Sequence, residues 1–161
     1  KKINIMKKEA LIIAVIATLL YSCSGEQEKK STEGSTAVAD LYKEKPSDPK
    51  GIGKFTDVPV DAKLNKEMAE AGLAIYDLKC SSCHKLTSEK LVGPGWEGVT
   101  LRRKPEWVMN FVTNVDEMLD KDANAKALLE VCLVKMPNQN LSDEDARHIY
   151  EYMRKNDGVK P

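Results

Sequence analysis

The residues most able to carry chemistry form one short segment, Cys80-Ser81-Ser82-Cys83-His84. Two thiols separated by two residues can add across the two vinyl groups of a haem, which gives two thioethers at one porphyrin edge. The adjacent imidazole can then turn onto the iron from one face. The motif therefore predicts one covalently attached haem c, bound through Cys80 and Cys83, with His84 as an axial iron ligand.

Closely spaced thiols also occur in two other kinds of site. A structural zinc site needs two further ligands, usually from a second Cys-x-x-Cys pair, and Cys132 offers one thiol at most. A thioredoxin-like redox site places its thiols after a strand of a βαβ unit, whereas a helix is expected directly before Cys80. The setting therefore favours haem attachment over zinc binding and thiol exchange.

Residues 1–22 predict a secretory leader. Lys7 and Lys8 give it a positive end, and an apolar run of eleven residues, 10–20, follows. Such a run suits a signal peptide and is shorter than the ~20 residues that span a bilayer. Its end, Leu20-Tyr21-Ser22-Cys23, resembles the lipobox of bacterial lipoproteins, in which the leader is removed and the cysteine carries lipid. Lipidation of Cys23 is expected; a cleaved, freely soluble periplasmic protein is the alternative.

Charge and composition exclude some classes of function. Removal of a leader with four lysines and one glutamate leaves 21 basic and 24 acidic residues, so the mature chain is mildly acidic. No long basic stripe is present, and nucleic acid is therefore not an expected partner. Aromatic residues make up only 6% of the chain, and a haem can supply the apolar bulk that they do not.

Residues 23–60 predict a lipid-anchored flexible linker. The stretch 25–36 is almost wholly polar and cannot offset its ordering entropy by burial. Prolines and glycines keep the following part irregular as far as Pro59. A linker of this kind lets a folded domain reach away from a membrane. The alternative is that part of 37–60 packs on the domain. The apolar residues available for such packing are Leu41, Tyr42, Ile52, Phe55 and Val58.

The folded part is expected over residues 61–157, followed by a short tail, 158–161. Apolar periodicity predicts about four helices and no alternating strand, so the fold class is mainly α. Pro105 suits the first turn of the second helix, and Ser142 is a good N-cap for the last one. Gly158 is a suitable stop after that helix. The helices are expected over about 64–79, 105–115, 122–133 and 142–156.

With these helices around it, the CSSCH segment resembles that of a class I c-type cytochrome, and the resemblance covers about residues 62–156. Gly72 and Tyr76 match the Gly-x-x-x-aromatic pattern of that family's first helix. The residues that match the end of its last helix are Ile149, Tyr152 and Met153. The resemblance implies the class I cytochrome c fold, with about four helices around one haem. It also implies that Gly72 of the first helix meets Tyr152 of the last.

The iron needs a second axial ligand from the side opposite His84. Met136 is expected to supply it, because this residue lies in a loop directly before the last helix, where the family places its axial methionine. Pro137 favours an extended conformation at Met136, whereas a methionine inside a helix usually fills the core. Met109 and Met153 are expected to fill the core in this way. The residues able to supply the second axial ligand are Met68, Met109, Met118, Met136, Met153 and His148.

The resemblance also assigns residues around the ligands. The backbone carbonyl of Pro94 is expected to accept a hydrogen bond from His84 and thereby to orient the ring. Trp96 and Arg102 are expected near the haem propionates; a solvated basic turn over 102–104 is an equal alternative for the arginine.

Three further residues are expected outside the site. Cys132 lies in an apolar, helix-like stretch and should behave as a small buried hydrophobe rather than as a reactive thiol. Trp107 should belong to the core, and His148, among charged neighbours in the last helix, should lie at the surface.

Ligation by His84 and Met136 leaves the iron no open position and raises its potential relative to two nitrogen ligands. The sequence therefore predicts a single-electron carrier and not an enzyme. The protein is expected in the bacterial cell envelope, facing the periplasm and held to a membrane by lipid. The stretches 106–110 (EWVMN) and 135–140 (KMPNQN) resemble those of monohaem cytochromes associated with respiratory reductases, and nitrous-oxide reductase is one candidate acceptor. The expected partners of the protein are a membrane donor and a reductase or oxidase acceptor.

Partner docking is expected at the haem edge near residues 80–82 and the Met136 loop, through a small and transient contact. Two alternatives remain open at this point. One is a haem-based enzyme or gas sensor in which Met136 is displaced from the iron. The other is a module without haem in which the two thiols handle thiol exchange or zinc.

Overall fold

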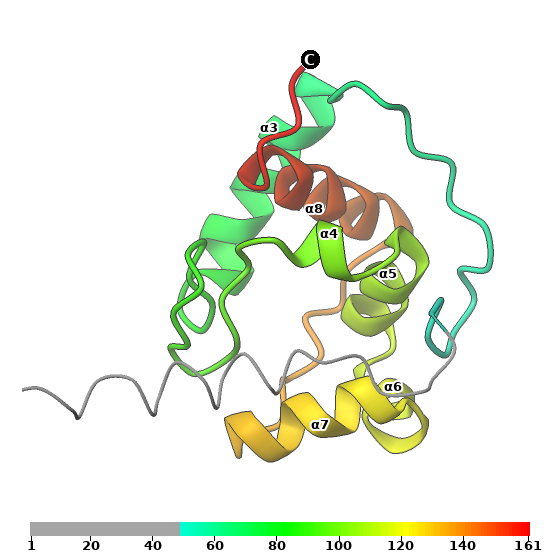
Figure 1. The fold of residues 1–161 in the computed structure, drawn as a ribbon, viewed down its shortest axis with the longest axis vertical. Coiled ribbons are helices and arrows are strands. Elements are labelled where there is room, and N and C mark those ends of the chain that lie inside the picture. Colours follow the sequence, from blue (N-terminus) through cyan, green and yellow to red (C-terminus); the bar gives the residue numbers. More distant parts are fainter. Residues whose placement is uncertain (1–48) are drawn as a thin grey trace, which may run out of the picture. The chain divides into compact units, whose positions relative to one another are not determined.

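The computed structural model describes residues 49–161; the leader, Cys23 and most of the expected linker lie outside the described residues. Within this range the chain is helical and forms no β-strand, which confirms the mainly α class. Its only β-type pairing there is an isolated bridge between His84 and Lys90. The elements are α3 (Lys66–Ile75), η1 (Tyr76–Cys80), α4 (Val99–Arg102), α5 (Pro105–Thr113), α6 (Val115–Lys121), α7 (Ala123–Cys132) and α8 (Asp143–Asn156) (Figure 1).

The first and last long helices, α3 and α8, pack across each other (Figure 1). Gly72 makes this crossing possible. A Cβ atom at this position would lie 2.2 Å from the carbonyl oxygen of His148 and 2.7 Å from Cβ of Tyr152. The expected contact between Gly72 and Tyr152 is thereby confirmed, and the glycine's weak helix propensity is offset by close backbone approach.

The start of α8 is determined by local chemistry. Ser142 accepts a hydrogen bond from the backbone of Asp145, whose carboxylate in turn accepts one from the backbone of Ser142. This capping box satisfies two N–H groups that the first helical turn cannot pair. The expected N-cap is therefore confirmed, and α8 is the frame on which α3, α4 and α5 pack.

A segment before α3, residues 49–62 (the N-terminal strap), belongs to the folded domain. Ile52, Phe55 and Val58 pack against the core. Asn110 of α5 binds the strap through its side-chain amide: the Phe55 N–H donates to Oδ1 at 2.9 Å, and Nδ2 donates to the carbonyls of Lys50 at 3.0 Å and Phe55 at 2.9 Å. The folded part thus begins before the expected boundary at residue 61. The alternative, packing of this stretch on the domain, holds for residues 49–60.

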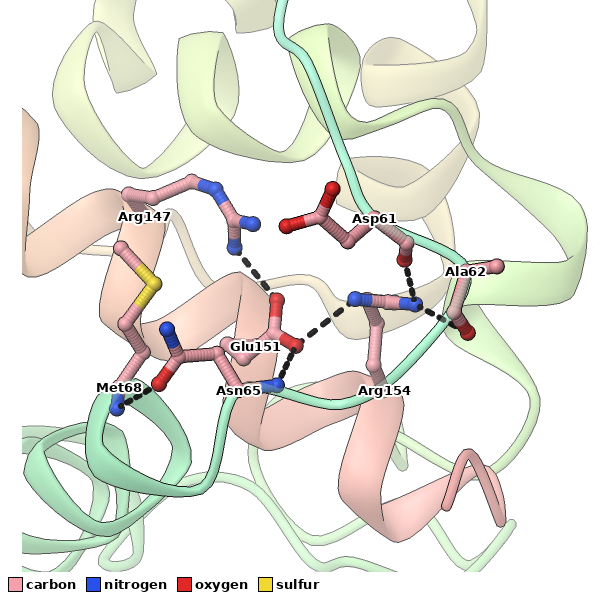
Figure 2. Close-up of polar contacts among 7 residues, drawn as sticks. All are labelled: Asp61, Ala62, Asn65, Met68, Arg147, Glu151 and Arg154. Carbon is pink, nitrogen blue, oxygen red and sulfur yellow. Dashed lines mark hydrogen bonds and ion pairs between the residues drawn. The ribbon is translucent and has the colours of Figure 1, made fainter. Parts of the chain in front are cut away.

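A buried charge cluster joins the end of the strap to α8 (Figure 2). Glu151 is fully buried and accepts hydrogen bonds from Arg147 at 2.6 Å, Arg154 at 2.7 Å and the backbone N–H of Asn65 at 2.8 Å. Arg154 also donates to the carbonyl of Asp61 at 2.6 Å. Burial alone would raise the pKa of Glu151, but these donors outweigh it and lower the pKa below its ordinary value.

Other parts of the fold depart from the expected boundaries. The helix expected over 64–79 is α-helical only to Ile75 and then widens into the π-turn η1, in which the Ser81 N–H donates to the Tyr76 carbonyl at 2.9 Å. Such turns concentrate at functional sites, and this one ends at Cys80. The tail is also part of the fold, since the carbonyl of Lys160 accepts a hydrogen bond from the Leu64 N–H at 2.8 Å.

Candidate functional site

A cavity with a mainly apolar lining lies between the loop after η1, α5, α7 and the loop before α8. Cys83 and His84 reach it from the first loop and Met136 from the last. The side chains that supply most of the apolar wall are Val99, Trp107, Val108, Phe111, Val112, Leu119, Leu128, Leu129 and Met153. The cavity therefore brings together a thiol, an imidazole and a thioether that come from opposite ends of the domain.

The ring of His84 is held in one orientation. Its Nδ1–H donates to the carbonyl of Pro94 at 2.9 Å, as expected, and this bond leaves the lone pair on Nε2. Gly93 supports the ring from the side, because a Cβ there would lie 2.3 Å from Cε1 of His84. The hydroxyl of Tyr76 donates to the His84 carbonyl at 2.8 Å. Burial lowers the pKa of His84, so the neutral ring that can ligate a metal is the favoured form.

The two motif thiols differ in their surroundings. Cys80 is buried at the end of η1, and burial raises its pKa to about 11. Cys83 is half-buried and lines the cavity. Both are free thiols, and the turn after η1 is closed by the N–H groups of Cys83 and His84, which donate to the Cys80 carbonyl at 3.0 and 2.9 Å.

Met136 lies in the loop before α8 and lines the cavity, and its role as an iron ligand stays a prediction. It is half-buried, and of the other methionines only Met153 also lines this cavity within residues 49–161. Met109 and Met153 are buried in the core, which confirms their expected packing. His148 is half-buried on α8, 3.9 Å from Glu144, and does not line the cavity.

Trp96 and Arg102 both line the cavity. The Trp96 ring is buried, with its centroid 5.0 Å from that of Tyr76 and 5.5 Å from that of His84. Arg102 ends α4, and its guanidinium donates to the Glu97 carbonyl at 2.8 Å. The start of α4 is fixed by Asp157, which accepts hydrogen bonds from the backbone N–H groups of residues 98 and 100 at 2.6 and 2.8 Å.

Trp107, Arg103 and Cys132 are among the lining residues that the sequence did not place at the cavity. Trp107 is a buried core residue, as expected, but it also forms part of the wall. Arg103 lies over the Trp107 ring, 4.8 Å from its centroid, and lines the cavity too. Cys132 is half-buried rather than fully buried and faces the same space. A signal in the sequence was available for Cys132. It lies only four residues before Met136, so the expected ligand loop begins next to it.

The donor set fits a covalently held haem. Two thiols stand next to the imidazole in sequence, a thioether reaches the cavity from another loop, and the wall between them is apolar. A haem bound there supplies a one-electron ferric/ferrous couple. Two glycines allow close packing around the imidazole. A Cβ at Gly93 would lie 2.3 Å from Cε1 of His84, and a Cβ at Gly95 would lie 2.0 Å from the Thr87 carbonyl oxygen. This arrangement of helices and donor side chains is that of a monohaem c-type cytochrome.

Comparison with known proteins agrees with this class. The family model for cytochrome c matches residues 69–157, and the chain belongs to the cytochrome c family. Its cofactor is accordingly one covalent haem c. No curated protein gives a significant match.

Solved structures give the same result. A cytochrome c from Rhodothermus marinus is 30% identical and superposes with a TM-score of 0.64, over 68% of this chain and 93% of that one. An engineered form of the Rhodothermus marinus protein is 29% identical, with a TM-score of 0.65 over 68% and 98% of the two chains. A further engineered structure, bound to a carbene intermediate, is 29% identical, with a TM-score of 0.62 over the same shares. The class I cytochrome c fold expected from the sequence is confirmed.

Proposed function

We propose that this protein is a single-electron carrier, a membrane-anchored monohaem cytochrome that passes electrons to an extracytoplasmic respiratory reductase or oxidase. Membership of the cytochrome c family supports electron transfer as the general role. The observation that carries the proposal is the meeting of His84 and Met136 in one apolar cavity. A haem held by an imidazole and a thioether would supply a one-electron couple that needs little rearrangement of the protein, which suits electron transfer.

The proposed roles of the site residues are supported by the CSSCH spacing and by the side chains that line the cavity. Cys80 and Cys83 would hold a haem through thioethers, and Nε2 of His84 and the sulfur of Met136 would bind its iron. Pro94 orients the His84 ring through its carbonyl. Met/His ligation raises the reduction potential and leaves substrates no open position on the metal.

Trp96 and Arg102 are the proposed contacts of the haem propionates. Trp96 packs against Tyr76 and His84, and its indole lines the cavity. Arg102 has the charge that a carboxylate needs, and its helix is held in place by Asp157.

The partner surface is proposed at the mouth of the cavity, near Ser81, Ser82 and the Met136 loop. Both serines are exposed. Val92 and Val134 line the cavity and are also 39% and 55% exposed, so apolar surface runs from the haem site to the outside. A small, partly apolar contact of this kind suits a transient redox complex. A respiratory reductase, such as nitrous-oxide reductase, is the proposed acceptor, and a membrane protein the donor.

Lipidation of Cys23 is proposed as the membrane anchor, with the protein facing the periplasm. The support is the apolar run of residues 10–20 that ends just before this cysteine. None of the helices formed by residues 49–161 has the length and apolar character to cross a membrane. Two or three acyl chains would hold the protein firmly at a bilayer, at ~0.8 kcal/mol per buried CH₂.

The test is to export the full chain in a host that attaches haem c, and then to measure its intact mass and its ferric and ferrous spectra. We expect one haem that survives denaturation, lipid on Cys23, and the low-spin ferric spectrum of Met/His ligation with its weak far-red band. A colourless protein, or haem lost in acid acetone, would refute haem attachment. A mass without lipid would refute the anchor alone.

A haem enzyme or gas sensor is the second candidate, and one observation favours it. An engineered relative with this fold is bound to a carbene intermediate, so the site of that protein accepts a ligand other than protein. CO binding separates the two functions. A ferrous protein that resists CO supports the electron carrier, whereas rapid CO binding with loss of the Met136 signature supports the sensor.

A further inference from the structure

Asp122 is a buried carboxylate with no role in the proposed site. Only 1% of its surface is exposed. One oxygen, Oδ1, accepts hydrogen bonds from Nε1 of Trp107 at 3.2 Å and from the backbone N–H of Ala125 at 2.8 Å. The other oxygen, Oδ2, is buried and has no hydrogen-bond partner in the described part of the chain.

An N-cap role does not account for this carboxylate. Asp122 caps α7 through its contact with Ala125, but asparagine and serine cap helices as well as aspartate does, without a charge. A buried carboxylate with one unsatisfied oxygen carries a desolvation cost that those residues reduce. The charge is therefore a feature separate from the cap.

The position of Asp122 places this charge one side chain away from the haem cavity. Trp107 lines the cavity together with His84 and Met136, and the N–H edge of its indole donates to Asp122. Trp107 is itself only 5% exposed. Little water therefore separates the carboxylate from the cavity, and its field is screened less than that of a surface charge.

We propose that Asp122 sets the reduction potential of the haem from behind Trp107. The ferric site carries one more positive charge than the ferrous site. A buried negative charge stabilises the ferric state and lowers the potential, which opposes the rise due to Met136. The electron passes between iron and redox partner, and Asp122 is neither oxidised nor reduced. The inference rests on haem occupying the cavity as proposed above.

The test is Asp122→Asn in the lipidated full-length holoprotein, with the midpoint potential measured by redox titration. Asparagine keeps Oδ1 as acceptor for Trp107 and for the α7 cap, and it removes the charge. At a fixed solution potential we expect the ferrous-to-ferric ratio to rise about tenfold, the order expected for one charge at an effective dielectric constant of about 20. For one electron this is an upward shift of about 59 mV. The shift should persist at high salt because the charge is buried.

The matched control is Asp120→Asn, which removes the same charge from an exposed residue of α6. Its potential should move little, and less still at high salt. An Asp122→Asn shift no larger than that of the control overturns the inference. A wild-type spectrum with the Met/His signature would at the same time leave the electron-carrier proposal standing.

A second variant covers the case in which Asp122→Asn does not accumulate. Asp122→Ser is also a neutral N-cap and is measured in the same way. A variant that unfolds at a lower temperature but keeps the wild-type potential shows a purely structural carboxylate and refutes the proposal. A raised potential in either neutral variant supports it.

Discussion

On one side of the cavity the ring of His84 is held from several directions, whereas on the other side Met136 is carried by a loop with mostly surface contacts. The imidazole donates to the Pro94 carbonyl at 2.9 Å, and the ring leaves no space for a side chain at Gly93. Tyr76 binds the backbone of the same residue at 2.8 Å. These contacts come from residues close in sequence and are partly buried.

The Met136 loop is attached differently. Lys79 donates to the Gln139 carbonyl at 3.0 Å, and Lys135 pairs with Asp116 at the surface. Exposed ion pairs of this kind contribute little to stability. The site therefore has a rigid side around the His84 imidazole and an adjustable side around the Met136 thioether.

The most drastic change to the rigid side is His84→Ala. Because the remaining ligand belongs to the adjustable loop, we expect almost no red holoprotein with a low-spin spectrum, although both thiols are intact. The measurement is the yield of covalent haem per protein after export, by pyridine haemochrome. His148→Ala, on α8 outside the cavity, serves as the control and should leave the yield unchanged. A normal low-spin spectrum in His84→Ala would show that another residue ligates that face.

The corresponding change on the adjustable side is Met136→Ala. We expect haem attachment to persist, the far-red ferric band to disappear and the potential to fall. If Met136 leaves the iron for about 1% of the time in the wild type, its removal raises the apparent CO affinity about 100-fold. Met109→Leu, a volume-conserving change in the core, is the control for both readouts. An unchanged CO affinity would mean that Met136 is not the sixth ligand.

Two features were predictable without knowledge of the tertiary packing. The cap at Ser142 acts over a few residues and is found where it was expected, and the bond between His84 and the Pro94 carbonyl, which the family resemblance implies, is present as well. The N-terminal strap was not predictable in the same way. Its binding depends on Asn110, an ordinary polar residue in the sequence, whose partners lie 55 and 60 residues away.

The same limit applies to the wall of the cavity. Trp107 and Asp122 are 15 residues apart in the sequence and are joined by a hydrogen bond. A pattern of apolar residues does not show which carboxylates are buried. Apolar periodicity does not reveal α6, because a helix of seven residues is too short to show a helical repeat. Burial of polar groups is decided by tertiary packing, which a pattern of apolar residues does not contain.

Glu151→Gln tests whether the rigid side and the adjustable side of the cavity both depend on α8. Two arginines, Arg147 and Arg154, would lose their buried counter-charge, and such a loss typically costs about 3–5 kcal/mol. We expect denaturant unfolding to show a loss of this order, with both spectroscopic signatures vanishing in one transition. Glu144→Gln, at an exposed position of α8, is the control.

The same carboxylate gives a pH dependence. Because the folded pKa of Glu151 lies below its ordinary value, its contribution to stability is present above that ordinary value and is lost as pH falls through the folded pKa. The acid limb of the stability profile should therefore be flatter in Glu151→Gln than in the wild type. Two parallel profiles would assign the acid sensitivity to other carboxyl groups.

Gly93→Ala tests how tightly the rigid side is packed. The added Cβ would lie 2.3 Å from Cε1 of His84, whose ring cannot turn without losing the Pro94 bond. Overpacking of this kind costs about 1–3 kcal/mol. We expect a lower unfolding free energy together with a perturbed axial-histidine signal in the NMR spectrum of the holoprotein. Ser88→Ala, at an exposed position of the same loop, should change neither quantity.

The smallest effect concerns Leu133, which ends α7 with φ +58° and a side chain that is 84% exposed. Leucine in this left-handed conformation costs about 1–2 kcal/mol, and asparagine tolerates it better; Asn140 of the same loop already adopts φ +50°. We expect Leu133→Asn to stabilise the protein by about 0.5–1 kcal/mol in denaturant unfolding. If the exposed leucine belongs to the partner surface, the same variant should slow oxidation by the partner protein but not by ferricyanide. If the variant is oxidised at the wild-type rate both by the partner protein and by ferricyanide, Leu133 is not part of the partner surface. Its left-handed conformation is then a feature of the Met136 loop only.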